Sequence, residues 1–122
     1  MSLNLNVREN SGVTVIEISG RLTLGEVATR LTDEVRRLIA AGKKSIILNL
    51  GGLTNMDSSG VGLLVSAFAT VHREGGQLKL SNLTSRVKDL LLVTKLYTVF
   101  EVYDDEPAAI ASFDLLARKS VV

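Results

Sequence analysis

The sequence predicts an α/β domain built on a mixed, mostly parallel sheet with an N-terminal hairpin and about four helices. Short β-branched and apolar runs alternate with segments whose apolar residues recur every three or four positions, which indicates strands followed by helices. The first two strand-like runs are separated only by Ser11-Gly12, which predicts a hairpin. No linker, repeat or low-complexity tract divides the 122 residues, so we expect a single domain over 1–122 with the order ββαβαβαβα.

The first half of the chain supplies the hairpin and the first helix. Apolar residues alternate with polar ones over 3–7, and 13–18 is a second strand that ends at Gly20. Thr23 is followed three residues later by a glutamate, which fits a capping box with Thr23 as N-cap. The helix that follows has a stripe of apolar residues to bury: Val27, Leu31, Val35 and Leu38.

The middle of the chain reads as a buried strand over 45–50, a loop at Gly51-Gly52 and a helix to about residue 74. The strand is short, apolar and rich in β-branched residues, as fully buried strands are. The helix has one apolar face, made of Val61, Leu64, Val65, Phe68 and Val71.

The last third repeats the pattern. A short strand over 77–80 leads into a loop, 81–84, that can cap the next helix, and 99–103 reads as the final strand. An acidic run ending in Pro107 then starts the last helix, since acids and proline are favoured in a first helical turn.

Composition narrows the classes of function. Lys and Arg (14) nearly balance Asp and Glu (13), so we expect neither nucleic acid nor an anionic membrane as a partner. The chain has no cysteine, which excludes disulfides and thiolate metal sites, and no clustered histidines, so we expect no metal and no cofactor. The longest uncharged stretch, 58–71, is too short to span a bilayer, and the N-terminus lacks the features of a signal peptide. These features predict a cytoplasmic protein.

The most informative stretch is Asn55-Met56-Asp57-Ser58-Ser59-Gly60-Val61-Gly62, at the turn between the buried strand and its helix. Sites in α/β sheets are built at this position, the carboxyl end of a strand. Asp57 is the expected N-cap, which places Ser58 in the first turn, near the positive end of the helix dipole. A hydroxyl there is a good acceptor for a phosphoryl group.

In a parallel sheet the loops 20–26, 51–58 and 81–84 emerge at one edge, which we call the rim. The rim is polar, made of small side chains and poor in aromatics, which favours a docking edge over an apolar ligand pocket. The residues predicted there are Thr23, Gly25, Asn55, Asp57, Ser58, Ser59, Ser81, Asn82 and Thr84.

The motif from Asp57 to Gly62, together with the order and spacing of elements over nearly the whole chain, resembles the anti-sigma-factor antagonists of the STAS domain family. The resemblance implies a binding protein rather than an enzyme. In its unphosphorylated form such a protein binds an anti-sigma factor that is also a serine kinase of the histidine-kinase-like ATPase group, and thereby releases the sigma factor. The kinase phosphorylates the first serine of the motif, here Ser58, and a serine phosphatase reverses the reaction. Asp57 and Ser59 would orient the hydroxyl, and Gly60 would let the partner approach closely.

One segment departs from the family pattern. Many antagonists carry Gly-x-Leu-Asp at the entry to the first helix, whereas this chain reads Gly20-Arg21-Leu22-Thr23, which removes a charge from the rim. The identity of the kinase therefore stays open. STAS domains also serve in lipid-transport complexes, as accessory subunits, and in stress-signalling complexes.

Two other classes fit the residues less well. A receiver domain phosphorylated on Asp57 needs an acidic pair after an early strand to hold Mg²⁺, and the turn here is Ser19-Gly20-Arg21. A serine hydrolase needs a nearby histidine. His72, on the same helix as Ser58, is about 21 Å further along it.

Overall fold

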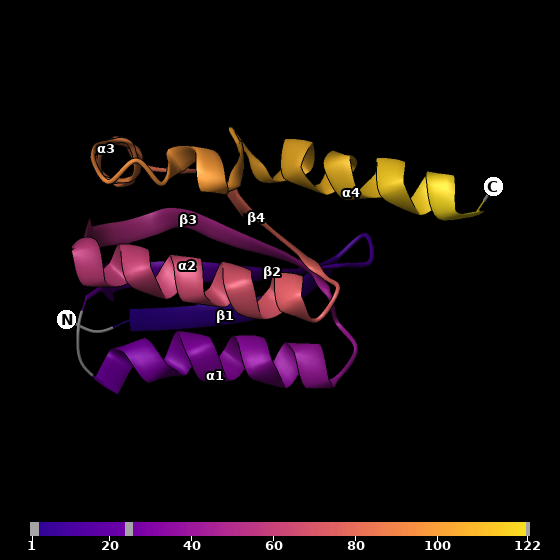
Figure 1. Ribbon diagram of the computed structural model, residues 1–122, viewed down its shortest axis with the longest axis horizontal. Helices are drawn as coiled ribbons and strands as arrows, with labels where there is room; N and C mark the ends of the chain where they lie inside the picture. The colour runs from indigo at the N-terminus through magenta and orange to yellow at the C-terminus, as the bar shows by residue number, and fades with distance from the viewer. Residues whose placement is uncertain (1–2, 24–25, 122) are drawn as a thin grey trace.

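The computed structural model describes residues 3–23 and 26–121, with the backbone alone described for 26–28 and 114–121. The strands are β1 (Leu3–Asn10), β2 (Val13–Leu22), β3 (Ser45–Met56), β4 (Gln77–Ser81) and β5 (Glu101–Tyr103). The helices are α1 (Glu26–Ala40), α2 (Ser58–Arg73), α3 (Ser85–Val93), α4 (Glu106–Val121) and a short 3₁₀ helix, η1 (Tyr97–Val99). The predicted order ββαβαβαβα is confirmed (Figure 1).

The five strands form one sheet in the order β1-β2-β3-β4-β5. β1 and β2 are antiparallel and every later pair is parallel, which confirms the mixed, mostly parallel sheet. The hairpin turns on Ser11 and Gly12, whose φ angles of 56° and 82° are both positive. Two-residue hairpin loops with positive φ at both positions match the twist of the strands that they join.

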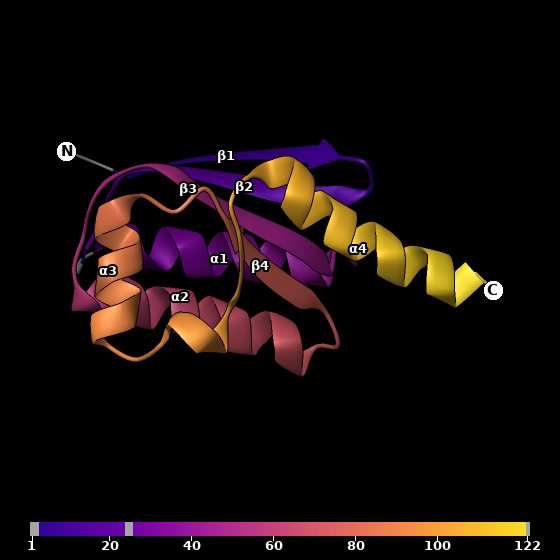
Figure 2. The ribbon, with the colours of Figure 1, turned by 90° about the horizontal axis from the view of Figure 1, so that it is seen from above.

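One face of the sheet carries the main core. α1 and α2 pack side by side on it, and α3 lies at the end where α2 begins (Figures 1 and 2). Because strand side chains alternate between the faces, Ile16, Ile46 and Leu80 all point into this core and are fully buried. The helices add Leu31, Val35 and Leu38 of α1, Val61, Leu64, Ala67 and Val71 of α2, and Val87 and Leu91 of α3.

The opposite face is covered by α4 and has a smaller apolar core, consisting of Val13, Val15, Ile47, Ala109, Ile110 and Phe113. Charged groups complete the contact at the start of α4. The guanidinium of Arg8 donates to the carboxylates of Glu17 (2.7 Å) and Glu106 (2.6 Å). Asn10 and Asn49 also donate to Glu106, at 2.9 and 3.4 Å. α4 is therefore held to the sheet by both apolar and ionic contacts.

Three predicted boundaries were wrong. The second strand does not end at Gly20, because β2 continues to Leu22 beside β3. Gly51 and Gly52 do not form a loop, because β3 continues through them to Met56. Val99 belongs to η1 rather than to a strand, and β5 starts at Glu101. No helix in the described part of the chain is long and apolar enough to cross a membrane.

Candidate functional site

The rim is built on the ends of β2 and β3, which extend beyond β4, while β1 accompanies β2 as far as Gly20, opposite Leu3. β3 pairs with β4 only as far as Asn49, opposite Ser81, and then continues beside β2 until Leu22 faces Met56. Register shifts on both sides of Ser19 mark bulges in this extension. A Cβ on Gly52 would lie 2.7 Å from the Cβ of Ser19, so the first bulge requires glycine at that position. The motif therefore sits at the tip of a two-stranded projection.

The N-terminus of α2 confirms the predicted local geometry. Asp57 has extended backbone angles (φ −114°, ψ −173°), and its Oδ1 accepts a hydrogen bond of 3.0 Å from the Gly60 amide. Asp57 is thus the N-cap of α2 and Ser58 is the first helical residue. Ser58 is exposed and Ser59 is half-buried. The Ser58 hydroxyl is accessible at the positive end of the helix dipole.

Gly60 has a packing role in the structure. It is buried, and a Cβ at this position would lie 2.3 Å from the carbonyl oxygen of Leu22 and 2.5 Å from Cγ of Met56. Glycine is therefore needed so that the first turn of α2 can pack against the end of β2. At Gly62, two residues later, an added Cβ would have no atom within 4 Å of it.

The segment after β4 also departs from the prediction. Ser81 is fully buried, which corrects its placement on the exposed rim. Asn82 is half-buried with φ of 59°, and its Cβ would lie 3.3 Å from a Cβ on Gly51. Thr84 caps α3, its Oγ1 accepting from the Val87 amide at 3.2 Å. Asn82 thus lies beside Gly51, and the stretch of β3 from Gly51 to the motif can span up to about 20 Å.

The remaining rim residues lie where β2 and β3 end. Thr23 directly follows β2 and is half-buried, and Asn55 is half-buried opposite Arg21. Gly25 lies outside the described residues. α1 begins at Glu26, so the predicted cap by Thr23 falls next to undescribed positions. The structure thus brings Thr23 and Asn55 to the same end of the β2–β3 projection as Asp57 and Ser58.

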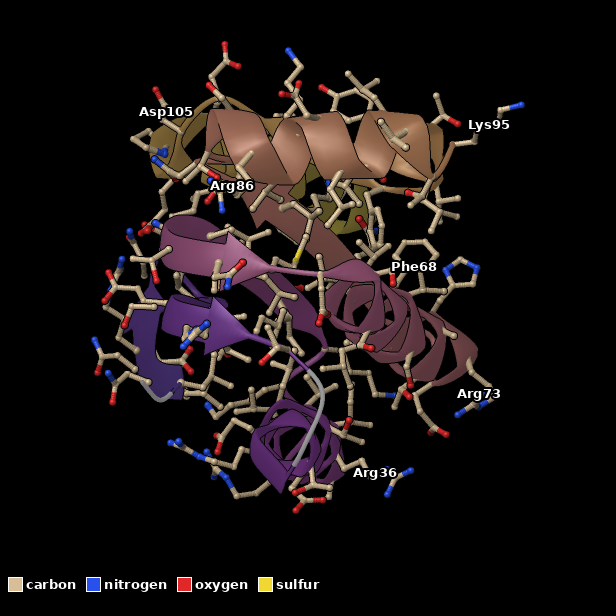
Figure 3. All side chains as sticks on the ribbon, turned by 90° about the vertical axis from the view of Figure 1, so that its left-hand side faces the viewer. Arg36, Phe68, Arg73, Arg86, Lys95 and Asp105 are labelled. Carbon is tan, nitrogen blue, oxygen red and sulfur yellow. The ribbon has the colours of Figure 1, made fainter. Side chains whose placement is uncertain are left out.

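Sequence reasoning missed a group of exposed apolar side chains on α3 and η1. Leu92 is 50% exposed, Val93 is 77% exposed and Val99 is 41% exposed. α3 crosses the molecule at the end that carries the tips of β2 and β3 (Figure 3). A signal was present, since four consecutive apolar residues, 90–93, cannot all lie on the buried face of one helix.

Residues 4–109 match the family model of the STAS domain. The chain belongs to the STAS domain family. The match covers every strand from β1 to β5 and the first turn of α4, so it includes the whole β2–β3 projection and the motif at its tip.

Two curated relatives share this domain over most of their length. An anti-sigma F factor antagonist from Paenibacillus polymyxa is 25% identical over 120 residues, covering 96% of this chain and all of the relative. An anti-sigma-B factor antagonist from Bacillus subtilis is 29% identical over 102 residues, covering 84% of this chain and 92% of the relative.

Two solved structures have the same fold. A putative anti-sigma factor antagonist from Thermotoga maritima superposes with a TM-score of 0.80 at 21% identity, over 88% of this chain and 92% of that one. The Bacillus cell fate determinant SpoIIAA, solved in its phosphorylated form, superposes with a TM-score of 0.67 at 22% identity, over 91% and 99% of the two chains.

Proposed function

We propose that this protein is an anti-sigma-factor antagonist, a binding protein switched by phosphorylation of Ser58. Its unphosphorylated form binds an anti-sigma factor that is also a serine kinase, which releases the sigma factor. Phosphorylation ends the binding, and a serine phosphatase restores it. The names of the two curated relatives and the phosphorylated form of a protein of the same fold support this proposal.

The observation that carries the proposal is the exposed hydroxyl of Ser58 at the first position of α2. A phosphoserine there adds about −1.5 to −2 charges. The helix N-terminus favours such charge by up to about 2 kcal/mol. The neighbouring Asp57 carboxylate opposes it, but Asp57 is exposed, so water weakens the repulsion. The free protein therefore tolerates the phosphate without unfolding.

Phosphorylation should affect partner binding more strongly than it affects stability, because a docked partner removes the water around Ser58. The Asp57 carboxylate and the phosphate would then lie side by side in a dry contact, where repulsion between like charges is much stronger. The surface we assign to the partner consists of Thr23, Asn55, Asp57, Ser58 and Ser59, together with the exposed apolar residues of α3. An apolar patch at the same end of the molecule as the polar switch supplies affinity that the charge can then cancel.

The decisive experiment incubates the protein with candidate anti-sigma kinases and ATP and locates the phosphate by mass spectrometry. We expect a single phosphate on Ser58, none in Ser58→Ala, and normal modification of the matched control Ser59→Ala. Ser58→Glu should fold normally and bind the kinase about tenfold or more weakly than the unmodified protein. Phosphate on Ser59 with Ser58 unmodified would contradict the assignment.

The role of the Asp57 charge needs a variant that keeps the cap. Asp57→Ala removes both the charge and the hydrogen bond to Gly60, which costs about 1 kcal/mol of stability. Asp57→Asn retains an oxygen that can accept this bond and removes only the charge. If Asp57 contributes to the switch by repulsion, phosphorylated Asp57→Asn should keep more of its affinity for the kinase than the phosphorylated wild type.

A further inference from the structure

A second concave surface lies at the opposite end of the sheet from Ser58, around the start of β4. It encloses about 680 Å³. Its walls come from Phe68 and His72 of α2, from residues 75–79, from Glu101 and Tyr103 of β5, and from Ser112 of α4. A volume of this size is typical of binding sites, and no step of the proposed switch uses it.

The floor of this cavity is an open edge of the sheet. β4 pairs with β3 from Gln77 onward, whereas its pairing with β5 starts only at Lys79, opposite Glu101. Among the described residues, Gln77 and Leu78 therefore have a strand on one side only. The chain from η1 through β5 runs from the side of α2 to the side of α4 (Figure 2), and the cavity reaches Gln77 and Leu78 beside it.

The backbone at this edge is oriented for pairing with another strand. The Gln77 amide donates to the carbonyl of Lys44, next to β3, at 2.8 Å. Because successive strand residues direct their main-chain groups to opposite sides, the amide of Leu78 points away from β3 and toward the open side. The Leu78 carbonyl belongs to the ladder with β5, so of the groups that the structure describes at this edge the amide of Leu78 is the one left without a strand partner, and an unpaired strand amide can accept an added strand.

The cavity has a wall on each face of the sheet, which suits the alternating side chains of a strand. On the α2 face the wall is aromatic, since Phe68 packs edge-to-face on Phe100 with ring centroids 5.4 Å apart. On the α4 face the wall is polar. There the buried ammonium of Lys79 donates to Ser112 (2.7 Å) and pairs with Glu101 (3.1 Å). An added strand would place one side chain on the aromatic wall and the next on the polar wall.

Charge indicates which side chains fit. Lys79 and Glu101 neutralise each other on the polar wall. At the mouth, the exposed residues Lys44 and Arg73 outweigh the exposed Glu74. Lys44 directly adjoins the edge, because a Cβ on Gly76 would lie 2.9 Å from its Cβ. Arg73 extends outward from α2 (Figure 3).

We propose that the open edge of β4 binds an extended, acidic peptide segment of a partner protein, in which apolar and acidic residues alternate. The peptide adds a short parallel or antiparallel strand beside Gln77 and Leu78. Main-chain hydrogen bonds give the affinity, and the two walls select the alternating side chains. Because this edge and Ser58 lie at opposite ends of the sheet, the peptide can be bound while the rim is occupied.

The proposal is tested by NMR titration of the full-length protein with a synthetic peptide of about six residues in which valine and glutamate alternate. We expect saturable shifts of the backbone amides of residues 75–79 and of Glu101, with Ser58 unaffected. A peptide with lysine in place of glutamate, and one with a central proline, should both bind at least about fivefold more weakly. The proposal would be overturned if about 2 mM peptide caused no chemical-shift change at these amides, or if all three peptides bound with equal affinity.

Protein variants locate the site independently of the rim. Arg73→Glu and Lys44→Glu should each lower the affinity for the glutamate peptide by about two- to fivefold. The Ser58→Ala variant should bind this peptide as tightly as the wild type does. Sedimentation of the protein without peptide provides a further test. If the edge pairs with a second copy of this chain, the protein forms dimers that the peptide cannot enter, and the assignment to a partner peptide is wrong.

Discussion

Among the side chains that the structure describes, α1, α2 and α3 enclose a cluster of twenty-one buried apolar residues on one face of the sheet, and α4 encloses six on the other face. The smaller cluster borders the ion pairs of Arg8 with Glu17 and Glu106, and Lys79 is buried against the ring of Phe113 at 4.4 Å from its centroid. Apolar burial depends little on pH and salt, whereas ion pairs depend on both. We therefore expect α4 to be the part of the fold that responds to solution conditions.

The largest expected effect is a cavity in the larger core. Leu64 is fully buried there, so Leu64→Ala should lower the free energy of unfolding by about 3–5 kcal/mol. Ile110 is 7% exposed in the smaller core, and Ile110→Ala should cost about 2 kcal/mol. Urea unfolding of both variants measures the difference. Equal losses would show that the two faces contribute alike.

The second effect concerns the packing of the first turn of α2 against the larger core. Gly60→Ala places a Cβ against the backbone of Leu22 and should cost about 2–3 kcal/mol, because a main-chain atom cannot move aside cheaply. The matched control is Gly62→Ala on the same helix, where the space is empty. That change should stabilise the protein by up to about 1 kcal/mol, because alanine favours helix. Thermal unfolding of both variants checks the pair, and a harmless Gly60→Ala would refute the close packing.

The third effect should appear only on the α4 face. The hydrogen bonds from Arg8, with smaller contributions from Asn10 and Asn49, hold the pKa of Glu106 at about 2, below its ordinary 4.5, although burial opposes this shift. A depressed folded pKa stabilises the fold above the unfolded pKa, and this contribution is lost as pH falls from about 4.5 toward 2. Because Arg8 is partly exposed, we expect a loss of about 1–2 kcal/mol rather than the full value of the shift.

Hydrogen exchange between pH 6 and pH 3 measures this loss element by element. Amides of α4 should lose protection at pH 3, while those of α2 keep it. Glu106→Gln should remove the pH dependence, and Glu74→Gln, on the other side of the sheet, should leave it unchanged. A uniform loss over both helices would mean that the two faces unfold as one unit.

The smallest effect is expected at Lys79. Lys79→Met removes the ion pair with Glu101 and the hydrogen bond to Ser112, but it also removes the cost of keeping a charge buried. The methionine can fill the same space against Phe113. We expect a change in the free energy of unfolding within about 1 kcal/mol of zero, measured by urea unfolding. A loss as large as that of Leu64→Ala would show that α4 is held mainly by this charge.

Features that depend on neighbours in the chain were predictable. The periodicity of apolar residues located all four helices and all five strands, and the cap of α2 by Asp57 followed from a contact over three residues. The exposure of Ser58 at the first helical position is a consequence of that cap. Local patterns sufficed because the atoms involved belong to one turn of chain.

Features that depend on distant segments were not predictable in this way. Gly51 and Gly52 were interpreted as a loop because glycine is common in turns, yet they extend β3 with bulges against β2. The place of Gly52 follows from the approach of Ser19, and that of Gly51 from the approach of Asn82, each about thirty positions away in the chain. The burial of Ser81 has the same kind of cause, because it depends on the segments around β4 that no pattern near residue 81 encodes.

The strands lie in the sheet in the same order as in the chain. During synthesis on the ribosome, each new strand can therefore join the edge formed by the one before it, and no earlier pairing has to open to admit it. Because α4 follows all five strands in the chain, Val13, Val15 and Ile47 stay without their cover until α4 has emerged. Domains that fold as they are made expose such surfaces to aggregation and to chaperones. We therefore expect the α4 face, rather than the rim, to be the vulnerable surface of the nascent chain.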